Sequence, residues 1–288
     1  EIVKEYLSKR ETGQNVYKLF ENITNCSEVI CIDEIKNKLF FKHRTFLEFM
    51  YSEDMFIKHG KSAKVEHPFD GYWGAVNYFY LGKLKDCPEQ LKEIFALIPK
   101  DEPELISKII QSGSYLLAAY QSPYEDITDC VKRVVLDAAD LYCNTCEEPS
   151  GSPLGRFPEV QLLAVITGLM RHTFEYDFFE HALRDVETEV LLSTDSEKRK
   201  AVAAFFVAAI RAGLGNTTAF DVLISDHLSN LPLALKLGIK HASNDAKVTN
   251  DTIKRLEKKM NRLNKGSSLL IKTIYEVPLD ERKGPVLV

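Results

Sequence analysis

The residues best suited to chemistry are His43 and Arg44, which stand between a short apolar run and an amphipathic stretch. The run Leu39-Phe40-Phe41 predicts a strand, and the spacing that follows predicts a helix from residue 43 onward. The first turn of a helix carries free backbone N–H groups and the positive end of its dipole, both of which attract anions. A histidine at this junction is therefore well placed to donate a hydrogen bond to an anion.

The predicted helix after His43 has one apolar stripe. Phe46, Phe49 and Met50 recur at helical spacing, so they are expected to form its buried side. Glu48 is expected on another face.

A nucleotide-binding P-loop is not encoded in this chain. Gly60-Lys61-Ser62 matches the end of that motif, but position 55, where the first glycine belongs, is Met55. That glycine turns a strand into the phosphate-binding loop, and a charged helix precedes it here instead. We therefore expect no catalytic core and no cofactor in this chain.

Two residue groups could bind a metal ion. Cys143 and Cys146 form a CxxC pair, but a structural zinc site needs four ligands, so two ordinary thiols are favoured. Asp177, His181 and Asp185 lie at i, i+4 and i+8, one face of a predicted helix. A solvated acidic face is favoured, and a metal-dependent hydrolase site is kept as an alternative.

An unusually dense group of aromatic residues follows at positions 69–80. One helix face cannot bury them all, so some are expected to pack between helices and others to be exposed. Tyr and Trp are enriched at binding hot spots. We therefore predict partner contacts for Tyr72, Trp73 and Tyr78.

The overall balance of the chain is mildly acidic. It has 288 residues, with 37 Lys and Arg against 42 Asp and Glu, and a formal charge of −5. This balance gives no electrostatic case for nucleic acid or an anionic membrane as a partner. The longest apolar run, residues 201–210, is about half a bilayer-spanning length and predicts a buried core helix. Six Cys in such a length fit a reducing, cytoplasmic setting.

Helices dominate the pattern. Apolar residues recur every three or four positions along most of the chain. Proline and carboxylates open several stretches, as in Asp101-Glu102-Pro103-Glu104, where a helix dipole favours them. The predicted helices are 3–10, 13–24, 43–58, 70–82, 88–98, 101–119, 124–143, 157–173, 175–192, 197–213, 217–229, 231–242 and 250–264.

The fold class expected is all-α. A small winged-helix-like unit over 1–56, with a β-hairpin at 29–41, precedes an α-solenoid-like array of helical hairpins over 68–265. The polar loop 147–156 is a candidate division of that array. Residues 266–288 are β-branched in part and are expected to form an extended tail or edge strand.

The stretch around His43 resembles the end of the winged-helix region in NACHT-type STAND NTPases, the NLR-like signalling ATPases. The family pattern there is aromatic-x-His-(Arg/Lys)-(Ser/Thr)-Phe-x-Glu-(Phe/Tyr), after a short hairpin. The matching residues here are Phe41, His43, Arg44, Thr45, Phe46, Glu48 and Phe49.

The resemblance implies a role in a switch. In that family the histidine contacts the β-phosphate of bound ADP, which places that role on His43. ADP or ATP and Mg²⁺ would then belong to an N-terminal NTPase core of the same protein, and this chain, which begins Glu1-Ile2-Val3, would be a fragment. The helical array would sense a trigger, often a viral protein, in bacterial antiviral defence, with oligomerisation on activation. The alternatives are a helical-repeat scaffold without a nucleotide link and the metal-dependent hydrolase.

Overall fold

The computed structural model describes residues 15, 18, 29–33, 35–36, 38–227, 231–263 and 268–282. The helices predicted over 3–10 and 13–24 fall almost entirely outside these residues. The division into a unit over 1–56 and an array over 68–265 therefore stays a prediction.

The first described elements are the hairpin and the helix that follows it. Strands β1 (Ile30–Asp33) and β2 (Lys38–Phe41) pair antiparallel, with Ile30 opposite Phe41. Helix α3 (Arg44–His59) begins three residues after β2 ends. The strand–helix order predicted around His43 is confirmed.

Helices make up nearly all of the rest, which confirms an all-α array with one small hairpin. Local chemistry sets several of their starts: the Asp101 carboxylate accepts the Glu104 N–H at 2.9 Å, and the Ser196 hydroxyl accepts the Arg199 N–H at 3.3 Å. The helices are α4 (Gly74–Leu84), α5 (Pro88–Ala96), α6 (Glu102–Ala118), α7 (Tyr124–Glu147), α8 (Glu159–Thr173), α9 (Glu180–Leu192), α10 (Glu197–Gly213), α11 (Asp221–His227), α12 (Leu233–Asp245), α13 (Asp251–Leu263) and α14 (Ser268–Glu276).

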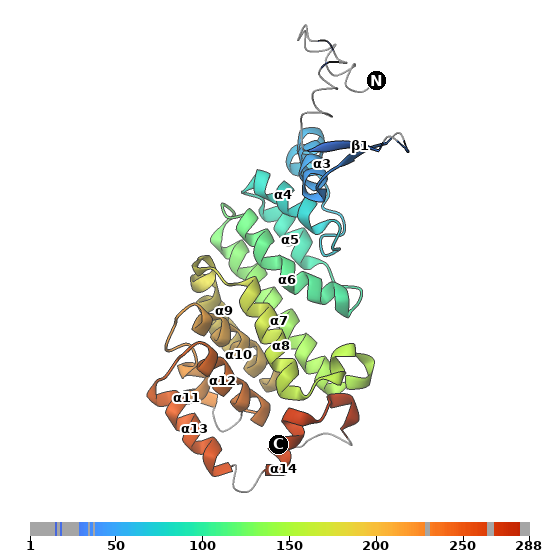
Figure 1. Cartoon of the computed structure of the whole chain (residues 1–288). Coiled ribbons are helices and arrows are strands. Elements are labelled where there is room, and N and C mark those ends of the chain that lie inside the picture. The colour runs from blue at the N-terminus through green and yellow to red at the C-terminus, as the bar shows by residue number, and fades with distance from the viewer. Residues whose placement is uncertain are drawn as a thin grey trace.

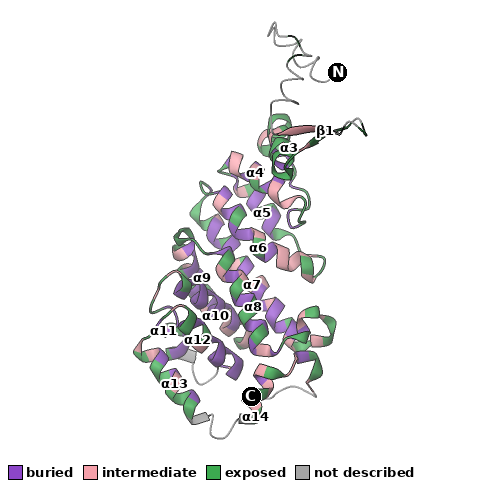
Figure 2. Cartoon of the chain, in the orientation of Figure 1, coloured by how far each residue is buried: buried purple, intermediate pink, exposed green. Residues whose placement is uncertain are grey.

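The helices stack in chain order into an elongated array, with the hairpin and α3 at one end and α13 at the other (Figure 1). Helix α3 packs on α4, α4 on α6, α7 on α9 and α10, and α12 on α13. The stretch 202–212 of α10 is buried along its whole length, because α7, α8, α9 and α12 surround it. Figure 2 shows this buried interior running from α4 to α12. The predicted core helix is thus central to the array.

One glycine permits the close packing of α6 on α8. A Cβ atom at Gly113 would overlap the carbonyl oxygen of Thr173. The Thr173 hydroxyl also donates to the Ile109 carbonyl oxygen of α6 at 2.9 Å. The two backbones can approach this closely because position 113 has no side chain.

The segment 147–156 does not separate two packed bodies. It forms two short 3₁₀ turns, η2 (Pro149–Gly151) and η3 (Pro153–Arg156), and the Ser152 hydroxyl donates to Glu102. Helix α6 before this segment packs directly on α8 after it, and α7 packs on α9. Its polar composition reflects turn formation at the end of α7 rather than a flexible connection.

The extended chain predicted over 266–288 is wrong for residues 268–276, which form α14. Its apolar residues Leu270, Ile271 and Ile274 recur at helical spacing, and α14 packs on α8. β-branched composition therefore misled here, because packing against α8 outweighs strand propensity. After α14, Pro278 forms a β-bridge to Pro158, and Leu279–Glu281 form a short 3₁₀ turn.

Candidate functional site

The hairpin and α3 together present His43 at the outer end of the array. His43 is the N-cap of α3, with an extended backbone, and its carbonyl oxygen accepts the Phe46 N–H at 3.1 Å. Its side chain is exposed and caps no described N–H of the first turn. That turn also contains no acidic residue. The start of α3 therefore keeps a positive dipole end beside an accessible imidazole, an arrangement that suits an anion.

Arg44 fixes the orientation of α3 against the chain that leads into α4. Its guanidinium donates to Glu48 at 2.5 Å and to the carbonyl oxygens of Gly71 and Tyr72 at 3.2 and 3.1 Å. It also lies 4.6 Å from the centre of the Tyr72 ring. Because four contacts converge on one side chain, the position of His43 relative to the array is defined.

The apolar stripe of α3 lies on the opposite side from the one predicted. Phe46, Phe49 and Met50 are 37%, 39% and 49% exposed, whereas Glu48 is 7% exposed and Ser52 is fully buried. The inward side of the helix carries Glu48 instead, and this carboxylate pairs with Arg44, which in turn donates to the carbonyl oxygens of Gly71 and Tyr72. The stripe is thus available to another surface.

The predicted partner residues lie beside α3, which they contact on two flanks. Tyr72 and Tyr78 are 50% and 41% exposed, and Trp73 is partly buried. The Trp73 ring packs edge-on against Tyr51 of α3 at 5.2 Å between centroids, and Phe79 does the same against Phe49 at 5.6 Å. We call this surface the α3–α4 apolar face; it comprises Phe46, Phe49, Met50, Tyr51, Tyr72, Trp73 and Tyr78.

The other predicted chemical groups are not assembled into sites. Asp185 accepts a hydrogen bond from Tyr124 at 2.8 Å, and no cluster of three metal-ligating side chains occurs in the described part of the chain. Burial raises the pKa of Cys143 to about 11 and that of Cys146 to about 12, which keeps both thiols protonated and unreactive.

The Gly-Lys-Ser triplet has no resemblance to a phosphate cradle. Residues 60–62 form a short 3₁₀ turn at the end of α3. Lys61 donates to the carbonyl oxygen of Asp86, and the Ser62 hydroxyl to that of His59. Ser62 thus stabilises the local turn, and Lys61 links it to the chain between α4 and α5.

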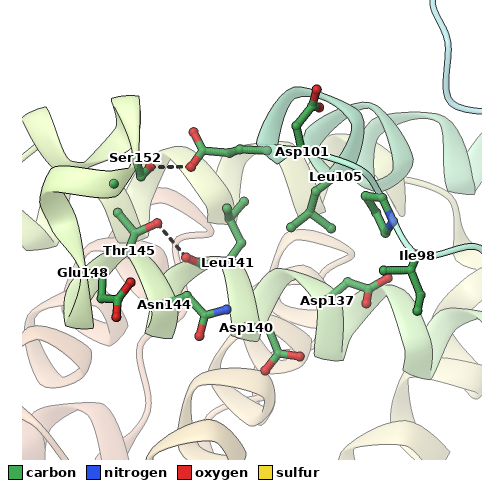
Figure 3. A pocket seen from close by; sticks show the side chains of 13 residues that line it. Ile98, Asp101, Leu105, Asp137, Asp140, Leu141, Asn144, Thr145, Glu148 and Ser152 are labelled. Carbon is green, nitrogen blue, oxygen red and sulfur yellow. Dashed lines mark hydrogen bonds between the residues drawn. The ribbon is translucent and has the colours of Figure 1, made fainter.

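A groove that the sequence did not predict runs between α6, α7 and η2 (Figure 3). It encloses about 400 Å³, and Ile98 at its rim is 89% exposed. The only sequence signal was the spacing of polar residues along α7, at positions 137, 140, 144 and 148. The acidic residues that line it are Asp101, Glu102, Asp137, Asp140 and Glu148.

A second hollow of about 450 Å³ continues the first along α7 toward Asp129. The two hollows share the lining residues Ile98, Pro99 and Asp137, so they adjoin there, and together we call them the groove along α7. Lys108 supports its floor. This lysine is buried, pairs with Asp137 at 2.8 Å and donates to the last carbonyl oxygens of α5.

Comparison with known proteins gives one match. The sequence profile of a family described as NACHT C-terminal Helical domain 1 matches residues 114–283, which lie from α6 onward. Residues 1–113, including α3 and the hairpin, lie outside the match. No curated protein and no solved structure matches the chain. In the described residues no helix combines the length and apolar character needed to cross a bilayer.

Proposed function

Because the matched residues make up more than half of the chain, the protein belongs to the family of the NACHT C-terminal helical domain 1, and we propose that it gates a nucleotide-locked switch. It provides the sensor region of a NACHT-type NTPase, whose core belongs to the same protein. In our proposal the α3 end contacts that core and its bound ADP, while the helical array receives a trigger protein in antiviral defence.

The observation that carries the nucleotide contact is the accessible His43 at the start of α3. A histidine that served only its own junction would have a buried side chain or one that accepts a hydrogen bond from the first turn. The His43 side chain is exposed and caps none of the described N–H groups of α3. Its imidazole N–H can donate to a phosphate oxygen, and the helix dipole favours that charge. Magnesium and the remaining phosphate contacts would come from the NTPase core.

The α3–α4 apolar face supports a contact with the same core. Its exposed aromatic and aliphatic side chains surround the helix that carries His43. Clustered exposed apolar residues of this kind mark protein interfaces. A core that covers this face would bring its nucleotide toward His43, so docking and the ADP contact would be gained or lost together.

Trigger binding is assigned to the groove along α7. It combines an exposed apolar rim at Ile98 with charged walls, which gives both binding energy and selectivity. A trigger that moves the switch from about 1% to about 99% open must prefer the open state by about 5.5 kcal/mol.

The proposal is tested in the complete parent protein by ADP calorimetry. A lost hydrogen bond to a charged group costs ~1.5–3 kcal/mol, so His43→Ala should weaken ADP binding by roughly tenfold or more. His172→Ala, which changes an exposed histidine on α8, is the matched control. Equal ADP affinity in His43→Ala and the control would exclude the nucleotide contact.

A second variant separates the sensor role from the lock. Ile98→Asp should leave ADP affinity unchanged and abolish the release of ADP that an individually expressed phage protein induces in the native protein. If Ile98→Asp responds like the native protein to every such trigger, the groove is not the sensing surface.

A further inference from the structure

The far end of the array is strongly basic although the whole chain is acidic. Residues 232–263, which contain α12 and α13, hold eight Lys and Arg against three Asp and Glu, a net charge of +5. The remaining residues therefore carry −10. The average over the chain conceals this separation of charge.

The cations of α13 lie on its solvent side. Lys254, Arg255, Lys258 and Lys259 are exposed, whereas the apolar stripe on the other side of the helix is buried against the array. The buried residues are Ile253, Leu256 and Met260.

Three of these cations lack the carboxylate partners that several lysines elsewhere in the array have. Elsewhere Lys132 pairs with Glu189 at 2.7 Å, and Lys198 with Glu147 at 3.1 Å. By contrast, Arg255, Lys258 and Lys259 have no carboxylate within ion-pair distance among the residues that the structure describes.

A buried lysine adds a second, independent observation. Lys236 of α12 is only 8% exposed, and none of the described carboxylates pairs with it. Burial and the nearby charge of Lys259 lower the pKa of Lys236. Two like charges held close together without a counter-charge are unfavourable, so an anion bound at the exposed Lys259 would stabilise both.

We infer that the α12–α13 surface, formed by Lys236, Lys240, Arg255, Lys258 and Lys259, binds the phosphodiester backbone of a nucleic acid independently of its sequence. Successive turns of α13 place cations about 5.4 Å apart along the helix axis, and each strand of a duplex contributes one charge about every 3.4 Å of the duplex axis. Neighbouring turns therefore meet different phosphates. This function goes beyond the nucleotide switch and does not depend on it.

The burial of the apolar stripe argues against a membrane as the partner. A helix that binds a bilayer must insert its apolar side, and α13 has already used that side in packing. An acidic protein would need carboxylates spaced to match, whereas any nucleic acid strand supplies regular charges.

The test is fluorescence anisotropy with a labelled 20-nucleotide single strand and a 20-base-pair duplex, between 50 and 200 mM NaCl. Three to four phosphate contacts predict a slope of log K against log salt of about −2 to −4. Arg255→Gln combined with Lys259→Gln should reduce the magnitude of that slope by about 2. The matched control is Lys58→Gln combined with Lys64→Gln, which removes the same charge at the end of α3 and just after it, near the opposite end of the array. This control should bind like the native chain.

Three results would overturn the inference. The first is an absence of binding at 50 mM salt, and the second is an equal loss in both double variants, which would indicate net charge alone. The third is competition by polyglutamate as effective as that by unlabelled DNA, which would indicate an acidic protein instead.

A variant of the buried lysine tests its part in binding. Lys236→Met should raise the Tm of the chain without DNA and diminish the rise in Tm that DNA produces. If DNA raises the Tm of this variant as much as that of the native chain, the buried lysine has no role in binding.

Discussion

Replacing Lys108 by Met should destabilise the array more than any exposed lysine substitution. The Lys108 side chain is 3% exposed, and its ammonium lies 2.8 Å from Asp137 of α7 and donates to the carbonyl oxygens of Phe95 and Leu97 at 3.2 and 3.1 Å. Methionine keeps the aliphatic stem but leaves the Asp137 carboxylate and the Leu97 carbonyl group without the ammonium, whereas the Phe95 carbonyl oxygen keeps its hydrogen bond from Arg133 at 3.1 Å. Lys108 therefore joins the end of α5 to α7 under the groove.

The size of the effect follows from burial. Removing one partner of a buried ion pair costs ~3–5 kcal/mol. Because the Asp137 side chain is 24% exposed and partly hydrated, we expect the lower end, about 3 kcal/mol. In a domain of this size 1 kcal/mol shifts the Tm by roughly 2–4 °C, so the expected drop is about 6–12 °C. Thermal unfolding followed by circular dichroism would measure it.

Lys92 provides the matched control, because it also joins α5 to α7. Its ammonium pairs with Asp126 at 2.9 Å but is 66% exposed, so Lys92→Met should leave the Tm nearly unchanged. Adding Asp137→Asn to Lys108→Met should recover part of the loss, since the lone charge is removed. A Tm for Lys108→Met within 2 °C of that for Lys92→Met corresponds to a stability difference of ~1 kcal/mol or less and would refute the argument from burial.

Two further predictions concern buried titratable groups. Burial raises the pKa of Glu187 above its ordinary value although Arg211 opposes the shift, so the folded chain holds this proton at higher pH than the unfolded chain does. The contribution of Glu187 to stability should therefore fall as pH rises above about 4.5. In urea unfolding, Glu187→Gln should become more stable relative to the native chain as pH is raised from 5 to 7.5. A stability difference between the two chains that is constant with pH would contradict this. The second prediction concerns Cys143 and Cys146, whose pKa values are raised to about 11 and about 12. Both thiols should resist iodoacetamide at pH 8 until the chain unfolds, and mass spectrometry of the labelled peptides would detect the modification. Rapid labelling of the folded chain would contradict this prediction.

Local signals were enough to predict most helices. Asp101 caps the helix that its segment was expected to open, and α10 occupies the predicted residues 197–213. Such features depend on neighbouring residues in the chain, so a sequence pattern contains them. The exposure expected for some of the aromatic cluster also holds for Tyr72 and Tyr78.

The errors arose where distant segments decide the outcome. The face of α3 depends on Arg44 reaching Glu48 and the backbone before α4, so Phe49 turned outward against its apolar pattern. The groove along α7 exists only because Ile98 and Lys108 come together from other elements. The roles of His43, Tyr72 and the other site residues stay predictions, since ligands and partners decide them.

Arg44 attaches α3 to the array through main-chain carbonyl oxygens, and this has a consequence for sequence variation. Every residue at positions 71 and 72 offers the same carbonyl groups, so the two hydrogen bonds would survive substitutions that replace the side chains there. The surface beside His43 could thus diverge, for instance to follow a changing partner, while the angle between α3 and the array is preserved. The main-chain hydrogen bonds thus preserve the geometry of the joint, while the side chains around it are free to evolve.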